Sequence, residues 1–167
     1  LLQNHKAVPG EQTHTWRMVA DTHLLPGSVR VRADDAVVSD LIEHRLETLA
    51  QFHAETSGTS AQEFSATFAT FLREKAKTAV GLKSIAAYRI GLDFDPTRPS
   101  ETEVRTALGN WFKEIEKEPS ARLMDPIIIR HVIWQGIDIG LPIQFHIGYG
   151  DPDLNLHKCD PLLMTEL

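Results

Sequence analysis

Apolar residues recur three and four positions apart in several stretches of the chain, and this spacing predicts amphipathic helices. The first predicted helix begins at Ser39 or Asp40 and ends near Glu55, before Ser57 and Gly58. Ser100 and Glu103 form a capping-box pattern, and Pro126 suits the first turn of a helix. The later helices are predicted from Ser60, from Ser100 and from Met124 to Gly140, with a last amphipathic run over residues 159–167.

Shorter apolar runs between these helices predict β-strands. Residues 79–88 and 141–147 are apolar enough for buried strands, although the alanines at 79–88 leave a helix open. Residues 16–25 and 28–32 fit a strand or, at 28–32, an extended loop, and residues 89–99 read as a loop. Strands that alternate with helices pair in parallel, so we expect an α/β fold with helical crossovers.

Composition narrows the class of protein. The 167 residues carry 17 Lys plus Arg against 23 Asp plus Glu, a formal charge of −6, which argues against a nucleic-acid-binding surface. The apolar runs are too short to span a bilayer, and the first ten residues lack the apolar stretch of a secretory signal. Cys159 is the only cysteine, which excludes an internal disulfide and a Cys-based zinc site. We therefore expect a cytoplasmic protein.

His146 is the sharpest candidate for chemistry. It lies near the end of the predicted strand 141–147, before a Gly-rich acidic loop over residues 148–153. Proteins with α/β barrels place their active sites at such strand ends. A neutral imidazole there is a good ligand for zinc or a similar divalent ion. The ordinary alternative is a half-buried histidine that bonds a backbone carbonyl.

Lys83 lies inside an otherwise apolar run over residues 81–87. A buried ammonium must be paired, deprotonated or modified, so Lys83 could hold a substrate carboxylate, act as a base or carry a carbamate between two metals. The alternative is an amine in solvent at the strand's end. Tyr88 and Arg89 add a hydroxyl and a guanidinium that suit a carboxylate-bearing substrate, unless they only support the fold.

The other histidines carry less weight. His157 is placed to face the site, because it lies in the loop after the last predicted strand. Ordinary surface or core roles are expected for His5, His14, His44, His53 and His131.

Two segments carry a resemblance to a known family. They are VGLKSIAAYRIGLDFDP, residues 80–96, and LPIQFHIGYGDPDLNLHKCDPLLMTEL, residues 141–167. Both resemble the amidohydrolase-2 branch of the metal-dependent amidohydrolase superfamily. Within that branch they are similar to the amidohydrolase domains found alone or fused to glutamine-synthetase-like domains.

The resemblance implies a (β/α)8 barrel, of which residues 1–167 would form a single domain that is a fragment, with about three of the central strands. It matches His146 to the metal-binding histidine of the fifth strand. Lys83 would lie on the preceding strand, where some branches use a carbamylated lysine. Residues 21–25 are similar to the first-strand metal motif, but Leu25 stands where its second histidine belongs, so His23 receives no ligand role.

The activity implied by the resemblance is hydrolysis of an amide or related C–N bond by water activated on a divalent metal, with zinc the first choice. Relatives with the same barrel also catalyse decarboxylation and isomerisation, so these reactions are alternatives. A further alternative is a non-catalytic fragment that lacks the full metal site. We expect a small-molecule substrate and neither nucleic acid nor membrane as a partner. A partial barrel would expose strand edges, which predicts aggregation or a homo-oligomer.

Overall fold

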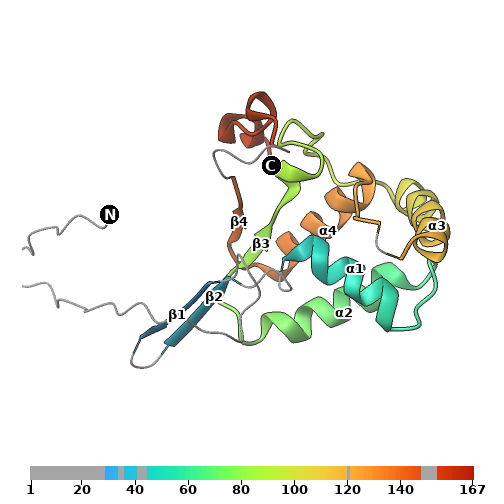
Figure 1. Ribbon diagram of the computed structural model, residues 1–167, viewed down its shortest axis with the longest axis horizontal. Helices are drawn as coiled ribbons and strands as arrows, with labels where there is room; N and C mark the ends of the chain where they lie inside the picture. The colour runs from blue at the N-terminus through green and yellow to red at the C-terminus, as the bar shows by residue number, and fades with distance from the viewer. Residues whose placement is uncertain (1–28, 34–35, 41–44, 120, 148–153) are drawn as a thin grey trace, which may run out of the picture.

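Strands and helices alternate along the part of the chain that the structure describes. A computed structural model describes residues 29–33, 36–40, 45–119, 121–147 and 154–167 (Figure 1). Its elements, in chain order, are β1 (Val29–Ala33), β2 (Ala36–Asp40), α1 (Leu46–Thr56), α2 (Phe64–Ala76), β3 (Leu82–Ser84), the 3-10 helix η2 (Ala86–Tyr88), α3 (Glu101–Lys117), α4 (Pro126–Ile139), β4 (Ile143–Phe145) and the 3-10 helices η3 (Leu156–Lys158) and η4 (Pro161–Met164). The strand expected at 16–25 lies outside the described residues.

Strands β3 and β4 pair in parallel, as the alternation of strands and helices predicts. Leu82 lies opposite Ile143, Lys83 opposite Gln144 and Ser84 opposite Phe145. Parallel neighbours need a long crossover between them, and α3 and α4 supply it. The α/β class is thereby confirmed, while membership of this pair in a (β/α)8 barrel stays a prediction. The strand expected over residues 79–88 is shorter than predicted, because its second half turns into η2.

The strand expected at residues 28–32 is confirmed as β1, but the element that follows it differs from the prediction. β1 and β2 form an antiparallel hairpin, in which Ser39 lies opposite Arg30 and Asp40 opposite Val29. The helix expected from Ser39 instead begins at Leu46. Val37 and Val38 explain the difference, since β-branched residues favour a strand and the helical spacing starts only after them.

The capping box predicted the start of α3 correctly, and α4 begins two residues after the predicted Met124. Ser100 and Glu103 form a complete capping box at α3. The Asp125 side chain accepts hydrogen bonds from the N–H groups of residues 127 and 128 at the start of α4, and Pro126 follows it. Gly140 ends α4 with φ at +79°, a conformation that L side chains rarely adopt. The start of α2 falls four residues later than predicted, since Ser60 bonds Glu63 in a preceding turn.

Replacing Ser100 with alanine is expected to lower the free energy of unfolding by about 1 kcal/mol, because the N-terminal N–H groups of α3 lose a cap. Urea denaturation of the Ser100→Ala variant measures the loss. Thr102→Ala, an exposed change in the same helical turn, is the control and should cost no stability. Equal stabilities of Ser100→Ala and the unchanged protein would contradict a stabilising role of the cap.

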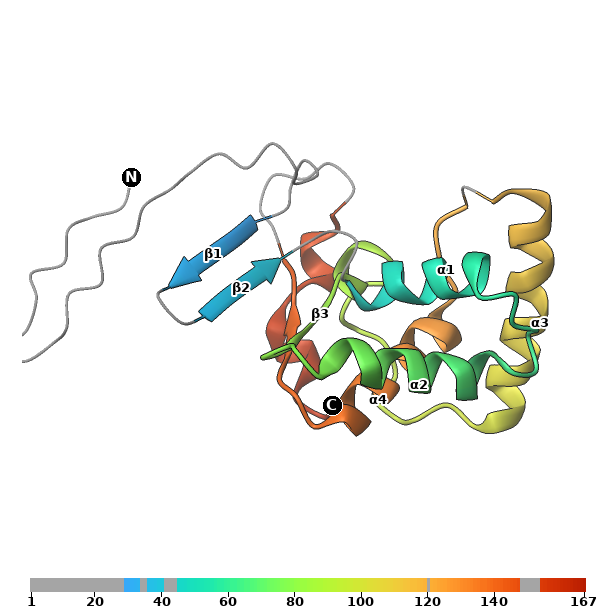
Figure 2. The same ribbon diagram turned by 90° about the horizontal axis from the view of Figure 1, so that it is seen from below.

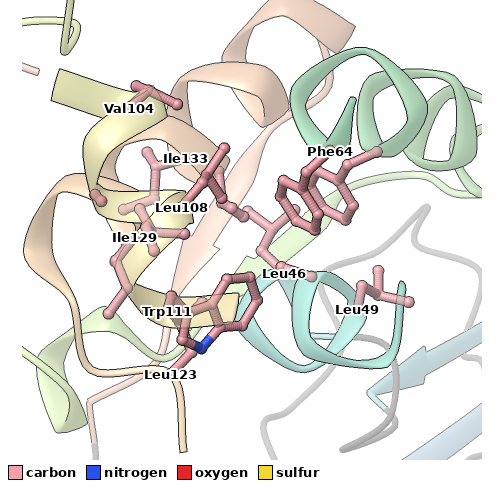
Figure 3. Packing of buried hydrophobic residues seen from close by; sticks show 14 of the residues in the cluster. Leu46, Leu49, Phe64, Val104, Leu108, Trp111, Leu123, Ile129 and Ile133 are labelled. Atoms are coloured by element: carbon pink, nitrogen blue, oxygen red, sulfur yellow. The ribbon is translucent and has the colours of Figure 1, made fainter. Parts of the chain in front are cut away.

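The core joins the four α-helices (Figure 3). Phe64 and Phe68 of α2 are fully buried. Their rings stack at 5.4 Å between centroids, and Trp111 of α3 meets the Phe64 ring edge-on at 5.6 Å. The other members labelled in Figure 3 come from α1, α3, the segment before α4, and α4: Leu46, Leu49, Val104, Leu108, Leu123, Ile129 and Ile133.

The helices cover one face of β3 and β4. Leu82, Ile143 and Phe145 pack against the core from the strand side. Figure 2 shows α1 and α2 side by side. α1 contacts β3, and α2 precedes β3 in the chain. Gly136 allows α4 to approach closely, because an added Cβ would lie 3.1 Å from Ile143 Cδ1 and 3.2 Å from Leu82 Cδ1. Residues that alternate with Leu82 and Ile143 therefore belong to the opposite face.

The C-terminal segment is not the continuous amphipathic helix that its pattern predicts. Residues 159–167 instead contain the short 3-10 helix η4, which Asp160 caps with its side chain, and the similar helix η3, capped by Asn155, precedes them. Asp160 and Pro161 favour such a short turn. Cys159 is buried there beside Ala87 and Leu92. Among the described helices none is long and apolar enough to cross a membrane.

Candidate functional site

Lys83 and His146 lie on neighbouring strands and on the same face of the β3–β4 pair. Lys83 is opposite Gln144 in the register, and the His146 N–H donates to the Ser84 carbonyl at 2.9 Å, which continues the ladder beyond β4. Because side chains alternate along a strand, Gln144 and His146 share a face with Lys83. That face is opposite to the one covered by the helices, and Lys83 and His146 are both half-buried. Lys83 and His146 thus occupy the same face of two neighbouring strands near their carboxyl ends.

Tyr88 joins this pair from η2. Its ring stacks on the His146 ring, with centroids 5.6 Å apart and planes 18° from parallel. The Tyr88 N–H donates to the Ile85 carbonyl at 2.9 Å, so the turn that follows β3 aims this ring at the end of β4. The stack restricts the orientation of the imidazole.

Arg89 follows directly and is half-buried. Its positive charge lowers the pKa of Glu47, a carboxyl group of α1, although burial of Glu47 acts more strongly and raises that pKa. Arg89 therefore lies near enough to Glu47 to act on that carboxyl group electrostatically. Its predicted role toward a substrate carboxylate stays a prediction.

Glu47 is the residue that the sequence analysis missed. Its side chain has 2% of its surface exposed and accepts hydrogen bonds from the Ser84 hydroxyl and the Ile85 N–H. The sequence pattern predicts that a glutamate in the first turn of a helix is exposed, since the helix dipole stabilises an acidic side chain there. Only the packing of α1 against β3 makes it a buried group.

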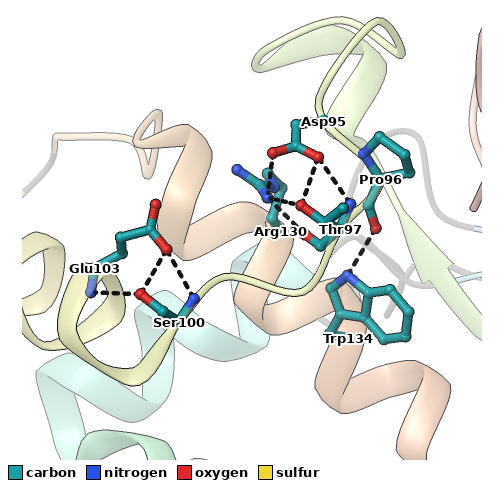
Figure 4. A network of polar contacts seen from close by, with 7 residues as sticks. All are labelled: Asp95, Pro96, Thr97, Ser100, Glu103, Arg130 and Trp134. Carbon is teal, nitrogen blue, oxygen red and sulfur yellow. Dashed lines mark hydrogen bonds and ion pairs between the residues drawn. The ribbon is translucent and has the colours of Figure 1, made fainter.

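The loop after Arg89, predicted over residues 89–99, is tied to α4 (Figure 4). Arg130 donates to Asp95 Oδ2 at 2.9 Å and to the Thr97 carbonyl at 2.5 Å. Trp134 Nε1 donates to the Pro96 carbonyl at 3.1 Å. Hydrogen bonds from Thr97 hold the pKa of Asp95 below its usual value. This network fixes the path from η2 to α3 and lies on the helical side of the molecule.

The other described histidines and the cysteine have partners elsewhere in the fold. His53 is a core residue that bonds the Thr67 hydroxyl at 3.0 Å and stacks on Phe71. His131 pairs with Gln135 on α4, and His157 is exposed on η3. Burial raises the pKa of the Cys159 thiol, which opposes reactivity. His5, His14, His23 and His44 lie outside the described residues.

Metal binding can be tested against the donors that are present. His146 supplies an imidazole at a strand end, which is a donor that zinc accepts. Within the described ranges, no group of three or more histidine, cysteine, aspartate or glutamate side chains could hold a metal ion. A zinc site that includes His146 therefore needs ligands from outside those ranges.

A hollow of about 510 Å³ lies beside β4, but on the other face. Its lining consists of Ile137, Gly140, Leu141, Pro142, Ile143, Phe145, Met164 and Leu167. None of the predicted site residues contributes to it, and Ile143 and Phe145 belong to the face that packs on the helices. This apolar hollow is separate from the candidate site.

Comparison with known proteins adds two similarities. The chain is 29% identical over 118 residues to Protein fluG of Emericella nidulans, a match that spans 64% of this chain and 13% of that protein. The structure is similar to the crystal structure of a protein assigned as a metal-dependent hydrolase from Lactobacillus casei ATCC 334, with a TM-score of 0.57 and 35% sequence identity. No protein-family model matches the chain.

Both matches cover only a small part of the other protein. The similarity to the solved protein covers 72% of this chain and 32% of that one. The chain thus spans about a third of the solved protein and about an eighth of Protein fluG. The fold is therefore similar to that of a protein assigned as a metal-dependent hydrolase. Assignment to the amidohydrolase-2 branch stays a prediction.

Proposed function

We propose that this chain is part of a metal-dependent hydrolase that acts on an amide or related C–N bond of a small molecule. The observation that carries the proposal is the common face of β3 and β4, on which Lys83 and His146 occupy neighbouring strand ends. The similarity to a protein assigned as a metal-dependent hydrolase supports it. The amidohydrolase-2 branch, a partial (β/α)8 barrel and a cytoplasmic location belong to the same proposal.

His146 would hold the metal, with zinc the first choice among divalent ions. When bound, such an ion lowers the pKa of a water molecule toward neutrality and polarises the carbonyl to be cleaved. Tyr88 keeps the imidazole in one orientation through its ring stack at 5.6 Å. Ligands beyond His146 would come from residues outside the described ranges.

Lys83 and Arg89 would act on the substrate or on the metal site. An amine on the same face as His146 can anchor a carboxylate, act as a base or carry a carbamate that bridges two ions. Arg89, one residue beyond Tyr88, would add a guanidinium for a carboxylate-bearing substrate. Intact-mass measurement of the protein distinguishes the carbamate from the free amine.

Replacing His146 with alanine is expected to weaken zinc binding by about tenfold or more and to abolish amide hydrolysis, because a ligand is lost. Isothermal titration with Zn²⁺ and elemental analysis of the protein that contains this chain provide the measurement. His157→Ala, which removes an exposed imidazole of η3, is the matched control and should leave zinc affinity unchanged. Unchanged zinc affinity in the His146→Ala variant would contradict the ligand role.

A further inference from the structure

A carboxylate is buried at the point where β3 ends. Glu47 lies in the first turn of α1, and 2% of its surface is exposed. Its Oε1 accepts a hydrogen bond from the Ser84 hydroxyl at 2.5 Å, and its Oε2 accepts one from the Ile85 N–H at 3.1 Å. Both carboxylate oxygens are therefore engaged where the strand turns into η2.

Further hydrogen bonds connect this point to the segments that carry the candidate site. The Ser84 hydroxyl oxygen accepts from the Ala86 N–H at 3.1 Å, and the Ser84 carbonyl accepts from the His146 N–H at 2.9 Å. The Ile85 carbonyl accepts from the Tyr88 N–H at 2.9 Å. The end of β3, the turn η2 and the end of β4 are thus joined around one side chain of α1.

The burial of this carboxylate is costly and needs a reason. Desolvation raises the pKa of Glu47, and the hydrogen bonds from Ser84 and Ile85 together with the charge of Arg89 act in the opposite direction. A leucine of similar volume would fill the space without that desolvation cost. It would leave the Ser84 hydroxyl and the Ile85 N–H without an acceptor, and buried donors of this kind are nearly always satisfied.

We propose that Glu47 is the positioning residue of the candidate site, which fixes the junction of β3 and η2 and so sets where Lys83, Tyr88 and His146 lie relative to one another. The inference rests on the proposed function for what those three residues do. Lys83 immediately precedes Ser84, and the stack of Tyr88 on His146 spans the junction that Glu47 holds. Reacting groups tolerate little displacement, since a shift of about 1 Å can cost roughly a hundredfold in rate.

Three variants separate positioning from general stability. Glu47→Leu removes both acceptor oxygens at similar volume, and Glu47→Gln keeps one of them. Leu49→Ala is the matched control, because it opens a cavity under the same helix at a side chain that is 6% exposed. All are studied in the protein that contains this chain, under conditions where urea titration shows each variant to be folded.

Two measurements report on the junction. In Glu47→Leu, the amide hydrogens of Tyr88 and His146 should exchange about tenfold faster than in Leu49→Ala after correction for global stability, since the two hydrogen bonds that Glu47 accepts at the junction are lost. Affinity for Zn²⁺ alone should fall about tenfold in Glu47→Leu, fall less in Glu47→Gln and stay unchanged in Leu49→Ala. A residue with only a structural role would not separate zinc affinity from stability in this way.

The outcomes distinguish this inference from the proposed function. Equal corrected exchange in Glu47→Leu and Leu49→Ala would overturn the positioning role. Unchanged zinc affinity in Glu47→Leu would also overturn it, provided that His146→Ala lowers that affinity. If His146→Ala has no effect on zinc, the proposed function is wrong, and the exchange measurement alone decides whether Glu47 holds the junction.

Discussion

The Phe64→Ala variant is expected to lose about 3–5 kcal/mol of its free energy of unfolding, the usual cost of removing a buried phenylalanine. The Phe64 side chain is fully buried, and its ring contacts rings of α1, α2 and α3 at centroid distances of 5.7 Å to His53, 5.4 Å to Phe68 and 5.6 Å to Trp111. Small domains are stable by only about 5–15 kcal/mol, so a loss of this size approaches unfolding. Urea titration followed by circular dichroism measures it.

Phe52→Ala is the matched control for this experiment. Phe52 is also a phenylalanine in the helical part, but 52% of its surface is exposed, and its ring contacts only the edge of the cluster through Phe71 at 6.4 Å. Its removal should change the free energy of unfolding by about 0.5 kcal/mol. Similar losses in Phe64→Ala and Phe52→Ala would contradict the position of the core between the four helices.

Local signals in the sequence predicted those elements whose boundaries depend on neighbouring residues. Ser100 and Glu103 satisfy backbone groups within one helical turn, and Pro126 suits a first turn because it lacks an N–H group, so both signals depend little on the tertiary arrangement. The strand over residues 143–145 was also predicted, because a short apolar run after Gly140 leaves few alternatives.

Other features depended on contacts that the sequence does not display. Ser39 and Asp40 resemble helix caps, yet they pair with Arg30 and Val29 of the preceding strand. Glu47 resembles an exposed helical residue until Ser84 and Ile85, nearly forty positions later, supply its hydrogen bonds. In each case a long-range partner overrides a local preference, which is the regime in which pattern analysis fails.

The candidate site combines both kinds of information. The residue types at positions 83, 88 and 146 drew attention through their chemistry, and their order along the chain placed them near strand ends. The register of β3 and β4 then decided that Lys83 and His146 share a face, since a slip of one residue would have moved one of them to the opposite side. The stack of Tyr88 on His146 follows from the turn η2, which the predicted longer strand did not include.

The contribution of His131 to stability is expected to fall as the pH drops from about 6.5 toward 4. Burial, together with the nearby charge of Arg98, lowers the pKa of His131 from 6.5 to about 4. The unfolded chain therefore takes up a proton as the pH falls below 6.5, whereas the folded protein takes it up only near pH 4. The stabilisation is complete above pH 6.5 and is lost across that window, by about 2 kcal/mol at pH 5.

Comparison of pH profiles isolates this contribution. Burial lowers the pKa of His53 as well and acts in the same direction, whereas the raised pKa of Glu47 favours the folded protein as the pH falls. The profile of the unchanged protein therefore sums opposing groups, and the informative quantity is the difference from His131→Gln, whose amide can still meet Gln135. Urea titrations should show a flatter profile for His131→Gln, while His157→Gln, an exposed control, retains the original one. Parallel profiles for the unchanged protein and His131→Gln would show that the pKa of this imidazole does not change on folding, which would contradict the prediction.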